Sequence, residues 1–365
     1  MCNACIPTLN TAQTTDAFAD RLVDMLNQGA LSLMVSIGHR TGLFDTLAEL
    51  PPSTSTEIAD HSGLDERYVR EWLGALVTGG IVQYRPDDGR YQLPASHAAV
   101  LTRAASPDNI AVFAQYIGLL GSVEDRVIDC FRNGGGVGYE HYPRFHAVMA
   151  EDSGQTVLSA LDEHVLPLVQ HLIPRLEQGI RVLDVGCGRA RVITRLAARF
   201  PRSEFVGLDL SDEALASARE EAARQGLSNI RFQQQDLTHF NRDAEPQGYD
   251  WVTAFDAIHD QAAPQNVLDG IHRTLKPGGT FLMQDINASS RLENNIAHPI
   301  GPLLYTISTL HCMTVSLAQG GAGLGTMWGE ELARKMLGVA GFSDIDVHQL
   351  DHDFQNSFYV IRKAA

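Results

Sequence analysis

The chain has 365 residues, of which 44% are hydrophobic and 20% are charged, and its formal net charge is −16 at pH 7. These proportions are typical of ordinary globular proteins, and a chain of this length can bury a large core without disulfide or metal staples. The acidic balance argues against broad nucleic-acid binding, because like charges repel the phosphate backbone.

Residues 1–15 are predicted to form a flexible tail without a secretory signal, because they contain neither a basic start nor an apolar stretch. No run approaches the roughly 18 apolar residues of a membrane helix, so we expect a cytoplasmic protein without a membrane partner. An odd, scattered set of cysteines does not suit a disulfide framework. The cysteines are Cys2, Cys5, Cys130, Cys187 and Cys312. Cys2 and Cys5 are spaced as C-x-x-C; we interpret them as two thiols in a loose tail, with an accessory metal or redox role as the alternative.

Residues 16–100 are predicted to form a mainly helical, winged-helix-like domain. Apolar residues recur at helical spacing from Phe18 to Ile37, and glycines at 38 and 42 predict a break. Two short capped helices and a strand–turn–strand pattern follow over 53–93.

Winged helices often bind DNA, which makes a regulator one hypothesis for this domain. The candidate recognition helix argues against it. Arg67 and Arg70 stand there against Asp65, Glu66 and Glu71, a net charge of 2 − 3 = −1. A helix that contacts DNA should present clustered basic residues, so dimerisation and covering of a substrate is the alternative.

Residues 101–175 are predicted to form a helical linker and lid, interrupted by the flexible triplet Gly134-Gly135-Gly136. Tyr142, Phe145 and Met149 follow at a spacing that places them on one helix face, with His146 beside them. They are candidate substrate or lid residues; plain core packing is the alternative.

Residues 176–365 alternate strand-like and helix-like segments, which predicts a parallel sheet. Strand 181–185 runs into a glycine-rich turn, where backbone can approach a ligand closely and free N–H groups begin a helix. The next two strands end at Asp209 and Asp236. A carboxylate some 20 residues beyond the glycines suits the two hydroxyls of a ribose. Each carboxylate alone could also be a solvated strand-end residue.

Five motifs occur in order in this region: VLDVGCGRA at 182–190, GLDLS at 207–211, QQDL at 234–237, FDAIHD at 255–260 and LKPGG at 275–279. On these motifs, residues 176–285 resemble the class I S-adenosylmethionine-dependent methyltransferases. The resemblance implies a doubly wound, Rossmann-like α/β sheet with S-adenosyl-L-methionine as its cofactor. Ala190 departs from the third glycine common in that family. Arg191 stands where a nicotinamide-binding G-x-G-x-x-G would need glycine, which argues against a dehydrogenase.

The same resemblance assigns roles to individual residues. Asp184 would orient the glycine loop and the methionine amino group, Asp209 would hold the ribose, and Asp236 would contact the adenine amino group. The implied cofactor-binding residues are Asp184, Gly186, Gly188, Asp209, Leu210, Asp236, Leu237 and Phe255.

His259 and Asp260 follow the fourth strand of this domain and resemble the His-Asp pair of small-molecule O-methyltransferases with an N-terminal winged-helix dimerisation domain. By that resemblance His259 is the general base, Asp285 orients it, and the protein is a homodimer. Histidine suits this role because its unperturbed pKa lies near neutrality. The alternative is a His259 that moves no proton.

Residues 288–325 are predicted to be a lid insertion over the active site, with Tyr305 and His311 as alternative bases or substrate contacts. No metal is predicted, because the histidines of this segment lack ligand spacing with neighbouring carboxylates. The sequence therefore predicts a methyltransferase that acts on a small molecule, with O-methylation of a hydrophobic or aromatic acceptor. A transcriptional regulator that senses S-adenosylmethionine is the alternative. A protein that binds the cofactor without methyl transfer is a further, weaker one.

Overall fold

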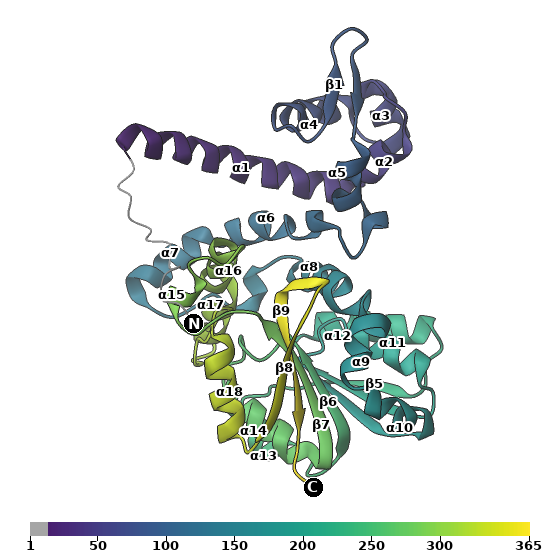
Figure 1. Ribbon diagram of the computed structural model, residues 1–365, viewed down its shortest axis with the longest axis vertical. Coiled ribbons are helices and arrows are strands. Elements are labelled where there is room, and N and C mark those ends of the chain that lie inside the picture. The colour runs from purple at the N-terminus through teal and green to yellow at the C-terminus, as the bar shows by residue number, and fades with distance from the viewer. Residues whose placement is uncertain (1–13) are drawn as a thin grey trace, which may run out of the picture. The chain divides into compact units, whose positions relative to one another are not determined.

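The computed structural model describes residues 14–365, which fall into two compact units, one ending at Gly121 and the other spanning Ser122–Ala365 (Figure 1). The Cys2–Cys5 pair and residues 1–13 of the predicted tail lie outside the described residues. The first unit extends beyond residue 100, and the predicted domain boundaries stay predictions. Among the described residues, none of the helices combines the length and apolar character needed to cross a membrane.

Helix α1 (Thr15–Thr41) is a single helix of 27 residues and continues through Gly38, where the sequence predicted a break. Glycine serves close packing there, because a Cβ at Gly38 would lie 2.5 Å from the Trp72 ring and 2.7 Å from the Phe44 ring. The helix ends at Gly42, whose φ of 77° is readily adopted only by glycine.

The rest of the first unit is a helix-turn-helix followed by a β-hairpin wing, as the sequence predicted. Thr54 and Glu57 form a reciprocal capping box, and Asp65 accepts from the first backbone N–H groups of the next helix. The elements are α2 (Leu43–Glu49), α3 (Ser55–Ser62), α4 (Glu66–Thr78), β1 (Gln83–Arg85), β2 (Arg90–Gln92), α5 (Ala95–Leu101) and α6 (Gln115–Gly121).

The second unit is built on a seven-stranded sheet with the order β5-β4-β3-β6-β7-β9-β8. The strands β3 to β7 are parallel, and β9 pairs antiparallel with both β7 and β8. The chain order reverses between β3 and β6, the place where open α/β sheets bind ligands at their carboxyl ends. The strands are β3 (Arg181–Val185), β4 (Glu204–Asp209), β5 (Ile230–Gln234), β6 (Tyr249–Phe255), β7 (Leu275–Ile286), β8 (Asp344–Leu350) and β9 (Asp353–Arg362).

Helices cover both faces of this sheet, which confirms the doubly wound fold (Figure 1). One core packs α10, α11 and α12 against strand residues such as Trp251; the other packs α13, α14 and α18 against residues such as Phe281. The helices are α9 (Leu166–Leu168), α10 (Ile173–Gln178), α11 (Arg191–Arg199), α12 (Asp212–Arg224), α13 (Phe240–Asp243), α14 (Pro264–Thr274) and α18 (Gly329–Val339).

Two segments outside the sheet hydrogen-bond to each other. The first contains α7 (Glu124–Asn133) and α8 (Phe145–Ser153); the second contains α15 (Leu292–Asn295), α16 (Gly301–Ile307), a π-helical turn (Ser308–Cys312) and α17 (Met313–Ala318). The Val137 N–H donates to Thr314 Oγ1 at 2.9 Å, and the Tyr142 hydroxyl donates to the Leu310 carbonyl at 2.6 Å. The predicted lid insertion therefore contacts the predicted linker and lid segment directly, just before α8.

Candidate active site

A cleft of about 480 Å³ lies at the carboxyl ends of β3, β4, β5 and β6. The eight residues predicted to bind a cofactor all line it, although they come from four separate strand ends. Such clefts of a few hundred cubic ångströms are typical of small-molecule sites.

The glycine-rich turn between β3 and α11 forms one wall of the cleft. Gly186 and Gly188 have φ values of 71° and 53°, in the left-handed region that favours glycine. A Cβ at Gly186 would lie 2.5 Å from the Ala257 Cβ, whereas a Cβ at Gly188 would meet nothing within 4 Å. The backbone at Gly188 is therefore open to a ligand.

Ala190 occupies the position where a third glycine is common, and its φ of 54° is left-handed. This conformation costs a residue with a Cβ roughly 1–2 kcal/mol. Ala190 is buried in the core beside α11, so its methyl group contributes to packing between helix and sheet.

Asp209 at the end of β4 supports the glycine-rich turn. Its Oδ2 accepts a hydrogen bond from the Gly188 N–H at 2.7 Å, and its Oδ1 accepts one from the Ser211 N–H at 2.8 Å. An ionised carboxylate offers about four lone-pair sites, so two remain for the hydroxyls of a ribose.

Asp184 and Asp236 differ in burial. Asp184 is buried and accepts a hydrogen bond from the Thr253 hydroxyl at 2.6 Å; burial raises the pKa of its carboxyl to about 7, although the Thr253 bond opposes the shift. Asp236 is exposed, and hydrogen bonds from the side chain and backbone of Thr238 lower the pKa of its carboxyl. Only the second is firmly an anion at neutral pH.

The lid residues predicted in and just before α8 face the cleft. Tyr142, Phe145, His146 and Met149 all line it. Tyr139, just before them, was not assigned a role from the sequence, yet it also lines the cleft and donates a hydrogen bond to Asp260 Oδ2 at 2.6 Å. Its hydroxyl therefore holds the lid segment against the residue after His259.

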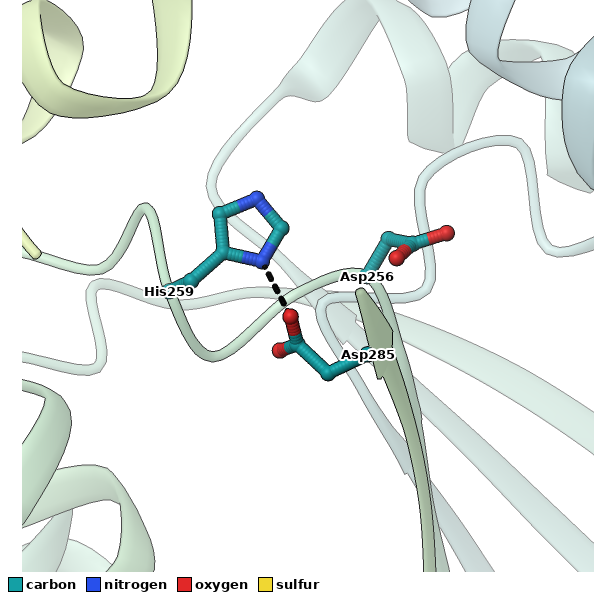
Figure 2. A group of neighbouring side chains, drawn as sticks. All are labelled: Asp256, His259 and Asp285. Atoms are coloured by element: carbon teal, nitrogen blue, oxygen red, sulfur yellow. Dashed lines mark hydrogen bonds and ion pairs between the residues drawn. The ribbon is translucent and has the colours of Figure 1, made fainter. Parts of the chain in front are cut away.

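His259 and Asp285 form a buried pair beside the cleft. The Nδ1–H of His259 donates to Asp285 Oδ1 at 2.8 Å, and the second ring nitrogen lies on the side away from Asp285 (Figure 2). The Trp328 indole N–H and the Ile286 N–H also donate to Asp285 Oδ1, at 2.9 and 2.8 Å. Three donors fix this carboxylate, and it in turn fixes the tautomer and orientation of the imidazole.

Burial alone would lower the pKa of His259, but the Asp285 carboxylate and the Cys312 thiol raise it, and the net pKa lies well above the ordinary histidine value. Burial also raises the pKa of the Asp260 carboxyl, to about 6, against the opposing effect of His259. Trp328 and Cys312 could not be assigned from the sequence, because 43 residues separate Trp328 from Asp285 and no motif includes either residue.

Tyr305 and His311, the candidates from the lid insertion, do not line this cleft. Tyr305 is partly exposed, and its hydroxyl accepts a hydrogen bond from the Asn295 amide at 3.3 Å. His311 is buried, and its ring stacks on Phe145 with 3.8 Å between the ring centroids.

One group of side chains among residues 14–365 could hold a metal ion. It consists of Asp256, His259 and Asp285, whose potential ligand atoms lie within 4.8 Å of one another. Asp285 Oδ1 already accepts three hydrogen bonds, one of them from His259. The expectation of no metal stays a prediction.

Two family models match the chain, one in each of the two compact units of the fold. Residues 29–103 match a model described as an Rv2258c-like winged HTH domain, and residues 176–318 match one described as a methyltransferase domain.

Two curated relatives are methyltransferases by name. The chain is 28% identical over 239 residues to the sterol 24-C-methyltransferase of Saccharomyces cerevisiae, an alignment that covers 64% of this chain and 55% of that enzyme. It is 27% identical over 188 residues to a ubiquinone biosynthesis O-methyltransferase of Coxiella burnetii, which covers 49% of this chain and 73% of that enzyme. The chain thus spans little more than half of the first relative.

Among solved structures, human N-acetylserotonin methyltransferase in complex with S-adenosylmethionine is similar, with a TM-score of 0.66 at 20% identity. The similarity covers 98% of this chain and all of that one, so the order of both domains is shared. At this identity the likeness establishes the fold.

Proposed function

We propose that the chain, which belongs to the S-adenosylmethionine-dependent methyltransferases with an N-terminal winged-helix domain, methylates a hydroxyl group on a hydrophobic or aromatic small molecule. The observation that carries the proposal is the buried His259–Asp285 pair next to a cleft with a glycine-rich wall.

Eight residues would hold the cofactor: Asp184, Gly186, Gly188, Asp209, Leu210, Asp236, Leu237 and Phe255. When bound, S-adenosylmethionine supplies an electrophilic methyl group on a sulfonium. The open backbone at Gly188 and the two unused lone-pair sites of Asp209 support this assignment.

The protein's own contribution is to place the acceptor and remove its proton. In the proposed step, the His259 ring nitrogen that does not bond Asp285 takes the hydroxyl proton as the oxygen attacks. Asp285, held by Trp328, stabilises the imidazolium that forms. Asp260, bonded to Tyr139, would keep the lid closed over the acceptor.

The aromatic lid favours a hydrophobic or aromatic acceptor. Tyr139, Tyr142 and Phe145 line the cleft, and rings of this kind pack against planar apolar molecules. The Coxiella relative, an O-methyltransferase by name, also favours oxygen as the methylated atom.

Calorimetry on the purified chain tests the proposal. We expect S-adenosylmethionine and S-adenosylhomocysteine to bind, and the oxidised and reduced nicotinamide dinucleotides not to bind. Methyl transfer from labelled cofactor to a panel of phenols is then expected. Binding of a nicotinamide cofactor instead would overturn the proposal, and cofactor binding without transfer to any phenol, alcohol or amine would favour the hypothesis of binding alone.

The observations do not favour the regulator hypothesis. The two arginines of α4 are both engaged in ion pairs on their own helix, Arg67 with Glu71 and Arg70 with Glu66. The acidic residues of α4 balance these two arginines, so the helix presents no cluster of unpaired basic residues, and the winged domain precedes a methyltransferase domain rather than standing alone.

The location of the protein in the cytoplasm stays a prediction.

We also propose that the protein is a homodimer that associates through α1. Apolar side chains of this helix are exposed at helical spacing: Phe18, Leu22, Met25, Leu26, Leu33 and Ile37. Leu26 is 73% exposed, and contiguous apolar stripes of this kind are typical of interfaces. A second copy would bury the same stripe on both chains.

Replacing Leu26 with glutamate should shift the protein from dimer to monomer in sedimentation equilibrium, because the charge would be buried at the interface. Asp24→Ala, on the opposite side of the helix, is the matched control and should leave the mass unchanged. A wild-type chain that sediments as a monomer would contradict the dimer, and a dimeric Leu26→Glu variant would place the interface elsewhere.

A further inference from the structure

One cation that lines the cleft has no anion beside it. Arg189 and Arg191 both line the cleft, and no lysine of the described chain does. Arg189 pairs with Glu213 at 2.8 Å, whereas Arg191 forms no ion pair with a carboxylate among residues 14–365. Arg191 is exposed, and its guanidinium has more N–H donors than the one it uses. A ligand in the cleft can therefore reach it.

Arg191 begins α11 directly after the glycine-rich turn, and its side chain also reaches the lid helix. Its Nη1 donates to the Ala150 carbonyl, in the last turn of α8, at 2.6 Å. Gly154 makes room for the guanidinium, because a Cβ there would lie 2.7 Å from Arg191 Nη1. The C-terminal end of a helix carries partial negative charge, which favours a cation at this position. One side chain thus joins the proposed cofactor wall to the lid.

The proposed cofactor brings one anion into the cleft, the carboxylate of its methionine part. The acidic side chains that line the same cleft outnumber its two arginines: Glu140, Asp184, Asp209, Glu213, Asp236, Asp256 and Asp260. Like charges repel, so a ligand carboxylate needs a cation in these surroundings. Arginine suits this task because its planar fork of donors matches the geometry of a carboxylate.

We propose that Arg191 binds the carboxylate of the cofactor's methionine part while it keeps its bond to Ala150, so that a bound cofactor fastens the lid helix α8. Phe145, His146 and Met149 of that helix line the cleft, and the contact would hold them in place for the acceptor. This inference rests on the proposed function. In the sequence, Arg191 only argued against a dehydrogenase.

A pair of ligands that differ in one charge tests the contact. S-adenosylhomocysteine carries the carboxylate, and in its carboxamide a neutral amide replaces that group. In calorimetric titrations, the wild type should bind the carboxylate form about tenfold more tightly than the carboxamide, as expected for hydrogen bonds to a charged group near solvent. Arg191→Met removes the charge and keeps an unbranched side chain suited to a helix, so this variant should bind both ligands equally.

Two further variants complete the titrations. Arg195→Met is the matched control, because Arg195 lies one turn further along α11, pairs with Asp162 at 3.4 Å and does not line the cleft. This control should keep the preference for the carboxylate. Arg191→Lys keeps the charge without the planar fork and should restore part of the preference that Arg191→Met loses.

Hydrogen exchange in the wild type tests the link to the lid, and it remains available if Arg191→Met does not fold. With each ligand at saturation, S-adenosylhomocysteine should slow amide exchange in α8 more than its carboxamide does, because only the carboxylate pairs with the Arg191 charge. The glycine-rich turn is the internal control. Both ligands would contact it, so its amides should be protected equally.

Three results of the titrations overturn the inference: equal affinity of the wild type for the two ligands, a preference that survives in Arg191→Met, or a preference that is also lost in Arg195→Met. Equal protection of α8 by both ligands overturns it in the exchange experiment. The first titration separates this failure from that of the proposed function. A protein that binds neither ligand refutes the function itself, whereas one that binds S-adenosylhomocysteine without a preference for the carboxylate refutes only the role of Arg191.

Discussion

Replacement of His259 by alanine is expected to lower turnover about 100- to 10,000-fold, the usual contribution of a positioned general base. The affinity for S-adenosylmethionine should be unchanged, because the glycine-rich turn and Asp209 lie on other strand ends. Initial rates with an acceptor found by screening, together with calorimetric cofactor binding, measure the two effects separately.

The matched control is His239→Ala. His239 precedes α13 in the same unit and does not line the cleft. Wild-type turnover in His259→Ala would show that this histidine moves no proton. If the variant loses both turnover and the ability to bind the cofactor, His259 has a structural role instead.

The same assignment has a pH dependence whose sign follows from the electrostatics. Only the neutral ring can accept a proton, and Asp285 holds the pKa of His259 well above its ordinary value, against burial. Turnover should therefore rise with pH and reach its plateau above the pH range in which an ordinary histidine titrates.

The Asp285→Asn variant should show two changes in this profile. The rising limb should move to lower pH, because the carboxylate that favours the charged ring is gone, and the plateau should fall, because the ring loses its orientation. An unmoved limb would assign the titration to a group other than His259.

The strand-end carboxylates were predictable from sequence because they follow from local pattern. In a parallel sheet, the carboxyl ends of the strands lie at one edge, so Asp184 and Asp209 near the ends of β3 and β4 and Asp236 just after β5 had to gather once the strands were recognised. The glycine-rich turn was predictable for the same reason, since left-handed backbone is adopted readily by few residues besides glycine.

The contacts that support the site were not predictable in this way. Trp328 reaches Asp285, and Tyr139 reaches Asp260 across 121 residues of sequence, and neither pairing has a periodicity or a motif. The helix break predicted at Gly38 was wrong for a related reason. Glycine at this position allows Trp72 to approach α1, and local helix propensity says nothing about such a tertiary contact.

Replacement of Asp209 by alanine is expected to weaken S-adenosylmethionine binding about 10- to 150-fold, which corresponds to roughly 1.5–3 kcal/mol for hydrogen bonds to one charged group. Two effects act together. The Gly188 N–H loses its acceptor, which loosens the turn, and the proposed ribose hydroxyls lose their anchor. Calorimetric titration measures the affinity, and thermal unfolding without cofactor measures the support that Asp209 gives the turn.

Asp212→Ala is the control for charge, because Asp212 is an exposed carboxylate at the start of α12 that pairs with Arg219 at 3.2 Å. It should leave both measurements near wild type. Asp209→Asn separates the two effects, since an amide keeps one oxygen that can accept from the turn but loses the charge. If Asp209→Asn recovers the melting temperature without recovering affinity, Asp209 contacts the cofactor directly. If it recovers both, its part is to hold Gly188 in place, and the ribose must be bound by other groups of the cleft.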